Sequence, residues 1–289
     1  MTELLEKIAA IVCLGVALSW VAPVPAVGSV SSLAEAEEAW ARRGEGYVGP
    51  DAEPTAVVQA IAAFETALVE RPRDLEVMWK LLRAIEFRGE YTAVNKTERR
   101  RLYAESVGLV ERALSILHGE GGLKGRSPED LAREVSDRPH AAAVHYWSAL
   151  HYGLFGDTHG AMSAIRKGVA KHIRLHAETA TLIDPEESSG GGARVLGRMH
   201  SEAPKVPLFT GWIDRNEAVR LLEEANAIAP DDPFNRVFLA DVWLSFRPRR
   251  SGEAIALLRS VVEEPAPVEA VVEHAEAARQ AREILAALD

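Results

Sequence analysis

The sequence predicts an all-α fold, an α-solenoid of stacked helical hairpins that ends in a capping helix. Two observations carry this prediction. The chain lacks the alternating apolar and polar runs, joined by Asn-Gly or Asp-Gly turns, that mark strands and hairpins. It also contains the same helical signature twice, far apart: Ala60, Phe64, Ala67 and Pro72, then Ala218, Leu222, Ala225 and Pro230.

Each signature describes one packed helix that ends abruptly. Residues four and seven positions apart lie on one face of a helix, and small alanine side chains let a neighbouring helix approach closely. Proline then prevents the helix from continuing. This is the pattern of the second helix in a tetratricopeptide-like hairpin, and such hairpins stack into binding scaffolds.

Three weaker copies raise the predicted number of hairpins to five. Each departs from the signature at one point: Ser106, Val110 and Ala113 have His118 in place of the proline; Ile173, Ala177, Ala180 and Pro185 lack the bulky middle residue; Ala254, Leu258 and Val261 have Pro265 one position early. The copies end at uneven intervals, so the array is not a regular repeat of about 34 residues. Insertions in solenoids tend to fall in loops on one face, often the binding face.

The composition is that of an ordinary acidic globular protein. Of 289 residues, 47% are hydrophobic and 26% are charged, which is ample for a buried core. Lys and Arg total 33 against 43 for Asp and Glu, giving a formal net charge of -10. This balance argues against nucleic acid as the partner, because phosphate backbones bind basic surfaces.

Residues 1–26 are predicted to be a signal peptide. An apolar run over residues 8–21 is followed by small residues, so we expect cleavage after Ala26, or else after Gly28. Acidic residues offset Lys7 at the start of the chain, so an uncleaved membrane anchor is the alternative and a buried first helix a third reading. Cys13 is the only cysteine, and a cleaved chain would contain no thiol. We expect an extracytoplasmic, periplasmic location.

The mature chain is predicted to have two parts. Residues 27–54 form a short helix over 32–43 and a linker that contains Gly and Pro, and residues 55–289 form the solenoid. Gly153 and Gly156 are expected to end a helix rich in aromatic residues, and Ser127 and Pro128 to start one. Pro185 is expected to end the helix over residues 159–183. The expected solenoid helices are 55–70, 75–88, 97–117, 128–135, 138–155, 159–183, 193–202, 214–228, 233–246 and 268–288.

The aromatic centre of the chain is the first candidate binding region. It contains Tyr146, Trp147, His151 and Tyr152. Aromatic residues at helical spacing belong to a core more often than to a ligand site, and both readings stay open here.

The loop over residues 203–212 is the second candidate region. Leu208, Phe209 and Trp212 are apolar, yet Pro204 and Pro207 prevent a continuous helix. These side chains must therefore be buried in the body, in a ligand cavity or against a partner.

Charged and titratable residues give two weaker signals. Arg194 and Arg198 are four apart on a predicted helix and could bind an anionic ligand or pair with Glu202. His172 and His176 have a spacing that can hold a metal, but no third ligand is signalled. No catalytic motif stands out, and the Gly190 to Gly192 run lacks the features of a phosphate loop. We expect no enzyme activity and no cofactor.

The chain also resembles a bacterial family over residues 56–258. The residues that carry the resemblance are Tyr146-Trp147, Gly190-Gly191-Gly192, Val195-Leu196-Gly197-Arg198, the Pro-rich loop 204–212, and Ala225 to Pro230 with residues 235–240. They resemble the T component (TatT) of TRAP transporters. The resemblance implies an exported helical protein that meets a periplasmic solute-binding protein, commonly as a homotrimer with apolar-lined pores. Membrane tethering by lipid is common in that family, but this chain has no convincing lipidation motif.

These observations lead to three functional hypotheses. The first is an accessory T component of a TRAP-type uptake system that binds a solute-binding protein and an apolar small ligand. The alternative is a general cell-envelope scaffold for protein–protein assembly. A metal-dependent enzyme using His172 and His176 is the least favoured.

Overall fold

The computed structural model describes residues 31–205 and 210–288, and it is all-α. The predicted signal peptide and the candidates Leu208 and Phe209 fall outside these ranges. No helix of the described ranges is long and apolar enough to cross a membrane. The α-helices are α1 Ser32–Ala41, α2 Pro54–Glu70, α3 Leu75–Glu90, α4 Lys96–His118, α5 Pro128–Val135, α6 Ala141–His159, α7 Ala161–Lys167, α8 Val169–Ile183, α9 Gly191–Glu202, α10 Arg215–Ile228, α11 Pro233–Phe246, α12 Ser251–Glu263 and α13 Val271–Ala286, with short 3-10 turns at Pro248–Arg250 and Val268–Ala270.

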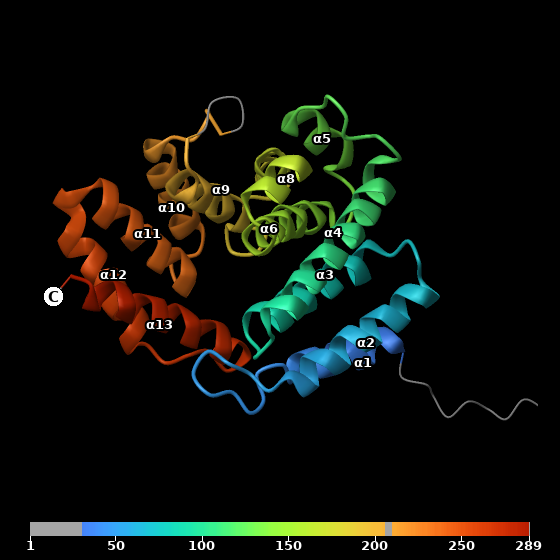
Figure 1. Ribbon diagram of the computed structural model, residues 1–289, viewed down its shortest axis with the longest axis horizontal. Helices are drawn as coiled ribbons and strands as arrows, with labels where there is room; N and C mark the ends of the chain where they lie inside the picture. Colours follow the sequence, from blue (N-terminus) through green and yellow to red (C-terminus); the bar gives the residue numbers. More distant parts are fainter. Residues whose placement is uncertain (1–30, 206–209, 289) are drawn as a thin grey trace, which may run out of the picture. The chain divides into compact units, whose positions relative to one another are not determined.

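The helices pack in chain order as five pairs, which confirms the predicted α-solenoid. The pairs are α1 with α2, α3 with α4, α6 with α8, α9 with α10, and α11 with α12. Each pair also contacts the next, and α13 packs on α11 and α12 as the predicted capping helix (Figure 1). The short helices α5 and α7 are insertions, packed on α8 and α6 respectively.

The helical signature marks the second helix of every pair, and its side chains are buried throughout. The three apolar positions of each copy are at most 8% exposed, in α2, α4, α8, α10 and α12 alike. Ser106, the polar member of the second copy, is fully buried, and its hydroxyl is hydrogen-bonded to Nδ1 of His151 at 2.8 Å. The spacing therefore identified the packing face of each second helix.

The prediction that Gly153 and Gly156 end a helix is wrong. The helix predicted to end at Gly153 or Gly156 continues to His159, and the helix predicted over 159–183 is two helices, α7 and α8. The break falls at Gly168, whose φ of 67° lies in the left-handed region that glycine adopts without strain. Elsewhere the predicted helices match the observed ones closely, with most of their ends within two residues.

Helix starts follow the expected capping chemistry. Ser127 accepts a hydrogen bond from the Asp130 amide at the start of α5, with Pro128 in the first turn. Ser31 does the same for the Ala34 amide at α1. These caps satisfy amide groups that a helix leaves without an internal partner.

Two large groups of buried side chains form the core. The first draws on α1 to α8, and the second on α10 to α13. A smaller group, centred on Ala193, Leu196 and Ala225, connects them through α9 and α10. One residue of α13, Val272, belongs to the first group although the rest of that helix packs in the second.

Val272 belongs to the first core because α13 returns to the beginning of the described chain (Figure 1). Arg43, just after α1, donates hydrogen bonds from Nε and a terminal nitrogen to Glu273 Oε1 at 3.0 and 2.8 Å, and another to the Glu269 carbonyl. Its guanidinium also lies 4.3 Å from the Trp40 ring centroid. The first and last helices of the array are thus tied to each other.

Candidate functional site

An apolar groove lies between α2 and α4, with α3 at its floor. Its volume is about 470 Å³, which is within the range of small-molecule and peptide sites. The lining residues come from three helices: Ile61, Glu65, Leu68, Val69 and Pro72; Leu81 and Ile85; Arg101, Leu102, Glu105, Leu109 and Arg112. We call this feature the α2–α4 groove.

Helical periodicity places these residues on facing sides of the groove. Ile61, Glu65 and Leu68 recur every three or four positions on α2, and Leu102, Glu105 and Leu109 do so on α4. The turn at Pro72 closes one end, where the Arg112 guanidinium donates a hydrogen bond to the Pro72 carbonyl at 2.5 Å.

The groove combines an apolar floor with charges of both signs at its rim. Val69 is 82% exposed, so a large aliphatic side chain stands open to solvent at the edge. Arg101 and Glu105 form an ion pair at 3.0 Å with both side chains more than half exposed. Exposed pairs of this kind contribute little to folding, so their charges are available to a partner.

The aromatic candidates lie in the core of the chain. Tyr146, Trp147, His151 and Tyr152 are at most 7% exposed, and none of them lines the groove. His151 is hydrogen-bonded to Ser106 Oγ at 2.8 Å and to the Leu82 carbonyl at 3.0 Å, so it joins α6 to α3 and α4. Burial lowers the pKa of His151 to about 4, which keeps the imidazole neutral.

A chain of buried histidines runs through the same region. The Nδ1 atom of His118 lies 2.7 Å from Glu134 Oε2, and its Nε2 lies 2.9 Å from Nε2 of His145. Nδ1 of His145 then lies 3.0 Å from Nδ1 of His176. We call Glu134, His118, His145 and His176 together the histidine chain.

The carboxylate at one end fixes the proton positions in the histidine chain. Glu134 accepts a hydrogen bond from Nδ1–H of His118, so a neutral His118 must accept a hydrogen bond at Nε2 from His145. His145 must in turn accept at Nδ1 from His176. A lone pair is therefore left on Nε2 of His176, a buried atom with no hydrogen-bond partner in the described part of the chain.

Burial holds all three imidazoles neutral. It lowers the pKa of His118, lowers that of His145 well below its ordinary value, and lowers that of His176 to about 3. Neighbouring imidazoles act in the same direction on His145 and His176, because a second positive charge would be repelled. The hydrogen bond from His118 lowers the pKa of Glu134, which keeps that carboxylate charged.

Of the predicted histidine pair on α8, His176 is fully buried and His172 is partly buried, and both rings stack on Tyr152. The His172 ring lies 4.2 Å from the Tyr152 ring, centroid to centroid, at 10°. The rings of His172 and His176 are 5.7 Å apart and nearly parallel. Among residues 31–205 and 210–288 there is no group of three or more His, Cys, Asp or Glu side chains that could hold a metal ion.

The two candidate arginines on α9 connect helices. Arg194 donates hydrogen bonds to Asn235 Oδ1 at 2.9 Å, to Asp232 Oδ2 at 3.2 Å and to the Ser188 carbonyl at 3.2 Å. Arg198 donates to Asp241 Oδ2 at 3.1 Å, forms an ion pair with Glu202, and lies 4.2 Å from the Phe238 ring centroid. Both contribute to the contact between α9 and α11.

Trp212 is half-buried beside α8 and α9. Its ring meets the His200 ring edge-on at 5.0 Å, and the Arg174 guanidinium lies 4.9 Å from its centroid. The Nδ1 atom of His200 accepts a hydrogen bond from the Asp214 amide at 2.9 Å. The structure thus brings Trp212 to the body of the protein, away from the aromatic candidates of α6.

The glycines of the Gly-Gly and Leu-Gly-Arg sequences allow close helix contacts. A Cβ atom at Gly191 would lie 2.4 Å from the Tyr146 ring, and one at Gly192 would lie 2.3 Å from Thr181 Oγ1. A Cβ at Gly197 would lie 2.6 Å from the Leu222 side chain. These distances are far below van der Waals contact, so α9 can pack this closely only because glycine has no Cβ at these positions.

The α2–α4 groove and the histidine chain were not identified from the sequence. Apolar residues recur at helical spacing over 61–68 and 102–109, but that spacing does not tell an open face from a covered one. The histidines that meet in the structure are separated by 27 and 31 positions, so only their placement on adjacent helices could have signalled the contact.

Comparison with known proteins gives one kind of match. No protein-family model and no curated protein matches the chain. One similar solved structure is a thermophilic TPR protein of Thermus thermophilus, with 19% sequence identity and a TM-score of 0.45. The alignment covers 77% of this chain and 91% of that one. The α-solenoid assignment itself rests on the packing order of the helices and on the buried signature positions.

Proposed function

We propose that the protein is a non-enzymatic scaffold that binds a partner protein in the α2–α4 groove. The observation that carries this proposal is the combination of an apolar floor, the exposed side chain of Val69 and a rim charged with both signs. An apolar groove between helices is a common receptor for an amphipathic helix of another protein.

The dimensions and chemistry of the groove favour one kind of occupant. Its wall on α2 extends from Ile61 to Val69, a little over two helical turns. An amphipathic helix of similar length could bury apolar side chains at every third or fourth position on the floor. Glu65 and Arg112 at the rim would pair with charges of opposite sign on the partner and fix its direction.

The test is site-specific photocrosslinking in the organism that makes the protein. A photoreactive benzoylphenylalanine replaces Val69 in one variant and Val268 in another. These two valines are 82% and 89% exposed, but only Val69 lines the groove. We expect a discrete crosslinked partner from position 69 and none from position 268.

Binding measurements with the identified partner complete the test. Val69→Arg should weaken its affinity at least about ten-fold, a loss of about 1.4 kcal/mol, because it places a charge against the apolar face. Val268→Arg should leave the affinity unchanged, and the far-ultraviolet circular dichroism of both variants should match the wild type. Equal crosslinking from both positions would exclude the groove as the binding site.

As a narrower proposal, this scaffold works outside the cytoplasm as the T component of a TRAP-type uptake system, and its partner is a periplasmic solute-binding protein. Support comes from the resemblance of residues 56–258 to that family and from the signal-like residues 1–26. An apolar small ligand and a trimeric assembly are part of the same proposal.

Two experiments separate the narrower proposal from the general scaffold. Amino-terminal sequencing of the protein from a periplasmic fraction should give a chain that begins at Val27 or Ser29. Mass spectrometry of the crosslinked partner should then identify a solute-binding protein. A partner of another class, with the crosslink still confined to position 69, would favour the general cell-envelope scaffold. A protein found only in the cytoplasm would exclude the extracytoplasmic role.

A further inference from the structure

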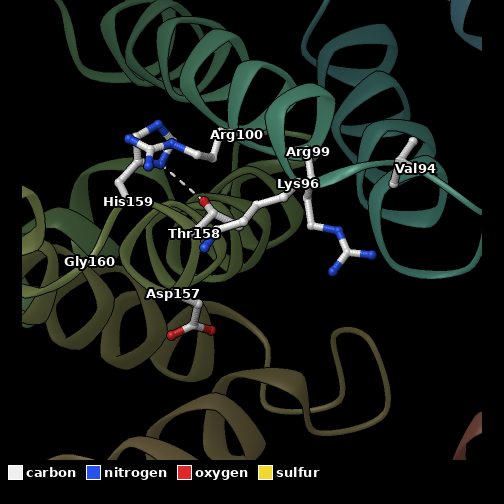
Figure 2. Close-up of a pocket in the computed structure, with 8 residues that line it drawn as sticks. All are labelled: Val94, Lys96, Arg99, Arg100, Asp157, Thr158, His159 and Gly160. Carbon is white, nitrogen blue, oxygen red and sulfur yellow. Dashed lines mark hydrogen bonds between the residues drawn. The ribbon is translucent and has the colours of Figure 1, made fainter.

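A second hollow lies between the first turn of α4 and the end of α6 (Figure 2). Its volume is about 510 Å³, and it shares no lining residue with the α2–α4 groove. Two stretches of the chain line it: Val94, Lys96, Arg99 and Arg100 on one side, and Asp157, Thr158, His159 and Gly160 on the other. We call it the basic pocket.

The cations of the basic pocket have no carboxylate partner. Lys96, Arg99 and Arg100 form no ion pair in the described part of the chain, whereas the next residue, Arg101, pairs with Glu105. The Nε atom of Arg99 is buried and has no hydrogen-bond partner among the described residues. Three free cations around one hollow are unexpected in a chain whose net charge is -10.

The positions of these side chains concentrate positive charge on one wall. All three stand in the first turn and a half of α4, where the helix dipole adds to the positive potential. Figure 2 shows Lys96 and Arg100 extending from α4 toward Thr158 and His159. The Thr158 hydroxyl is uncharged and donates to the Leu154 carbonyl at 2.8 Å.

The opposite end of the pocket carries an acceptor. Asp157 has no ion pair or hydrogen bond within residues 31–205 and 210–288, and in Figure 2 its carboxylate points away from Lys96 and Arg100. Surrounding protein atoms partly desolvate Asp157 and raise its pKa above the ordinary value, although the side chain is exposed. Asp157 is exposed at the rim of the pocket, so its free carboxylate can accept a hydrogen bond from a ligand hydroxyl group.

We propose that the basic pocket binds a small hydroxylated organic phosphate, with its phosphate against Lys96 and Arg100, which extend to the same side in Figure 2, and its hydroxyls near Asp157. A phosphate fits better than a carboxylate because it carries up to two charges and more acceptor oxygens, and arginine binds it in a bidentate manner. The hollow exceeds what a bare phosphate needs and falls in the range of small-molecule sites. The same chemistry exists in free metabolites and in lipid headgroups.

The test is titration calorimetry of the full chain with glycerol 3-phosphate, inorganic phosphate and glycerol. Glycerol 3-phosphate should bind at least about ten-fold more tightly than inorganic phosphate, and glycerol should not bind. Arg100→Gln should weaken the binding of glycerol 3-phosphate about ten-fold or more. Arg101→Gln makes the same charge change one residue further along α4 and should leave the affinity within about two-fold. Asp157→Leu should remove the preference for glycerol 3-phosphate over inorganic phosphate.

Vesicle sedimentation distinguishes the two sources of the phosphate. Binding to phosphatidylglycerol vesicles that Arg100→Gln abolishes, without binding of free glycerol 3-phosphate, would support the same pocket with a lipid headgroup as its ligand. Failure of inorganic phosphate, glycerol 3-phosphate and these vesicles to bind would overturn the proposal. Equal weakening by Arg100→Gln and Arg101→Gln would also overturn it, because net charge alone would then explain the binding. The probes test the basic pocket; of the residues changed, only the control Arg101 lines the α2–α4 groove.

Discussion

The imidazoles of His118 and His145 face each other through their Nε2 atoms at 2.9 Å. Because each neutral ring has one donor and one acceptor nitrogen, one of the pair must donate and the other accept. The hydrogen bond of His118 to Glu134 decides which, and it makes His145 the donor. Protonation of both rings would place two donors in contact inside the core.

Acid should therefore destabilise the protein through its buried histidines. The pKa values of His151 and His176 in the folded chain, about 4 and about 3, lie below the ordinary value of 6.5. Below pH 6.5 the unfolded chain takes up protons that the folded chain cannot, so the free energy of unfolding falls as the pH falls. Between pH 6.5 and 4.5 each group should cost roughly 2 to 3 kcal/mol.

Urea unfolding at several pH values measures this loss. In His176→Gln the amide can still donate to His145, but one titrating group is removed. The difference in stability between wild type and variant should shrink by about 1.4 kcal/mol for each pH unit below 6.5. A difference that stays constant from pH 7 to 5 would show that His176 takes up its proton in the folded state.

Alanine should be tolerated at an exposed glycine of α4 but not at the close contacts of α9. Gly197→Ala would bring a Cβ to 2.6 Å from the Leu222 side chain, so it should destabilise the chain by about 1 to 3 kcal/mol. Gly108 has open space around it in the interior of α4, and Gly108→Ala should stabilise by roughly 0.5 to 1 kcal/mol. Thermal unfolding of both variants tests the difference in sign.

The contact between the two ends of the array should contribute measurably to stability. Arg43→Ala removes the hydrogen bonds to Glu273 and the contact with the Trp40 ring, so it should cost roughly 2 to 3 kcal/mol. Hydrogen exchange should also become faster in α13. Arg133→Ala breaks an exposed pair with Asp130 and should cost less than about 1 kcal/mol. Similar costs for the two variants would contradict a structural role for Arg43.

The several N–H donors of the Arg194 guanidinium, and not its charge alone, should be required to hold α9 against α11. Arg194→Lys keeps the charge but cannot reach Asp232, Asn235 and the Ser188 carbonyl together, so it should cost roughly 1 to 3 kcal/mol. Arg220 pairs only with exposed carboxylates, and Arg220→Lys should change the free energy of unfolding by less than about 0.5 kcal/mol. Urea unfolding compares the two; an equal change would exclude a role for these donors.

The second helix of each pair could be predicted because it buries one face. Buried residues at spacings of four and three positions can be recognised in the local sequence. The roles of the glycines could not be predicted. Gly156 lies inside α6, where a Cβ would meet the Val169 side chain at 3.1 Å, whereas Gly168 breaks the chain with a positive φ. Both are single glycines in helix-forming surroundings, and only packing from elsewhere separates them.

The environment of the candidate site residues depends on long-range contacts that local spacing does not contain. His151 bonds to groups 45 and 69 positions earlier in the chain, and those partners make it a core residue. The α2–α4 groove likewise forms from three helices whose apolar residues look alike in sequence whether they are covered or open. Placement of a surface residue such as Val69 therefore required the structure.

The tie between Arg43 and Glu273 limits how this architecture can evolve. In an open solenoid, duplication of a hairpin lengthens the array and leaves every existing interface intact. Here the last helix touches the beginning of the described chain, so an added hairpin would pull Val272 out of the core that it completes. Variation should therefore enter through insertions such as α5 and α7, while the number of hairpins stays constant.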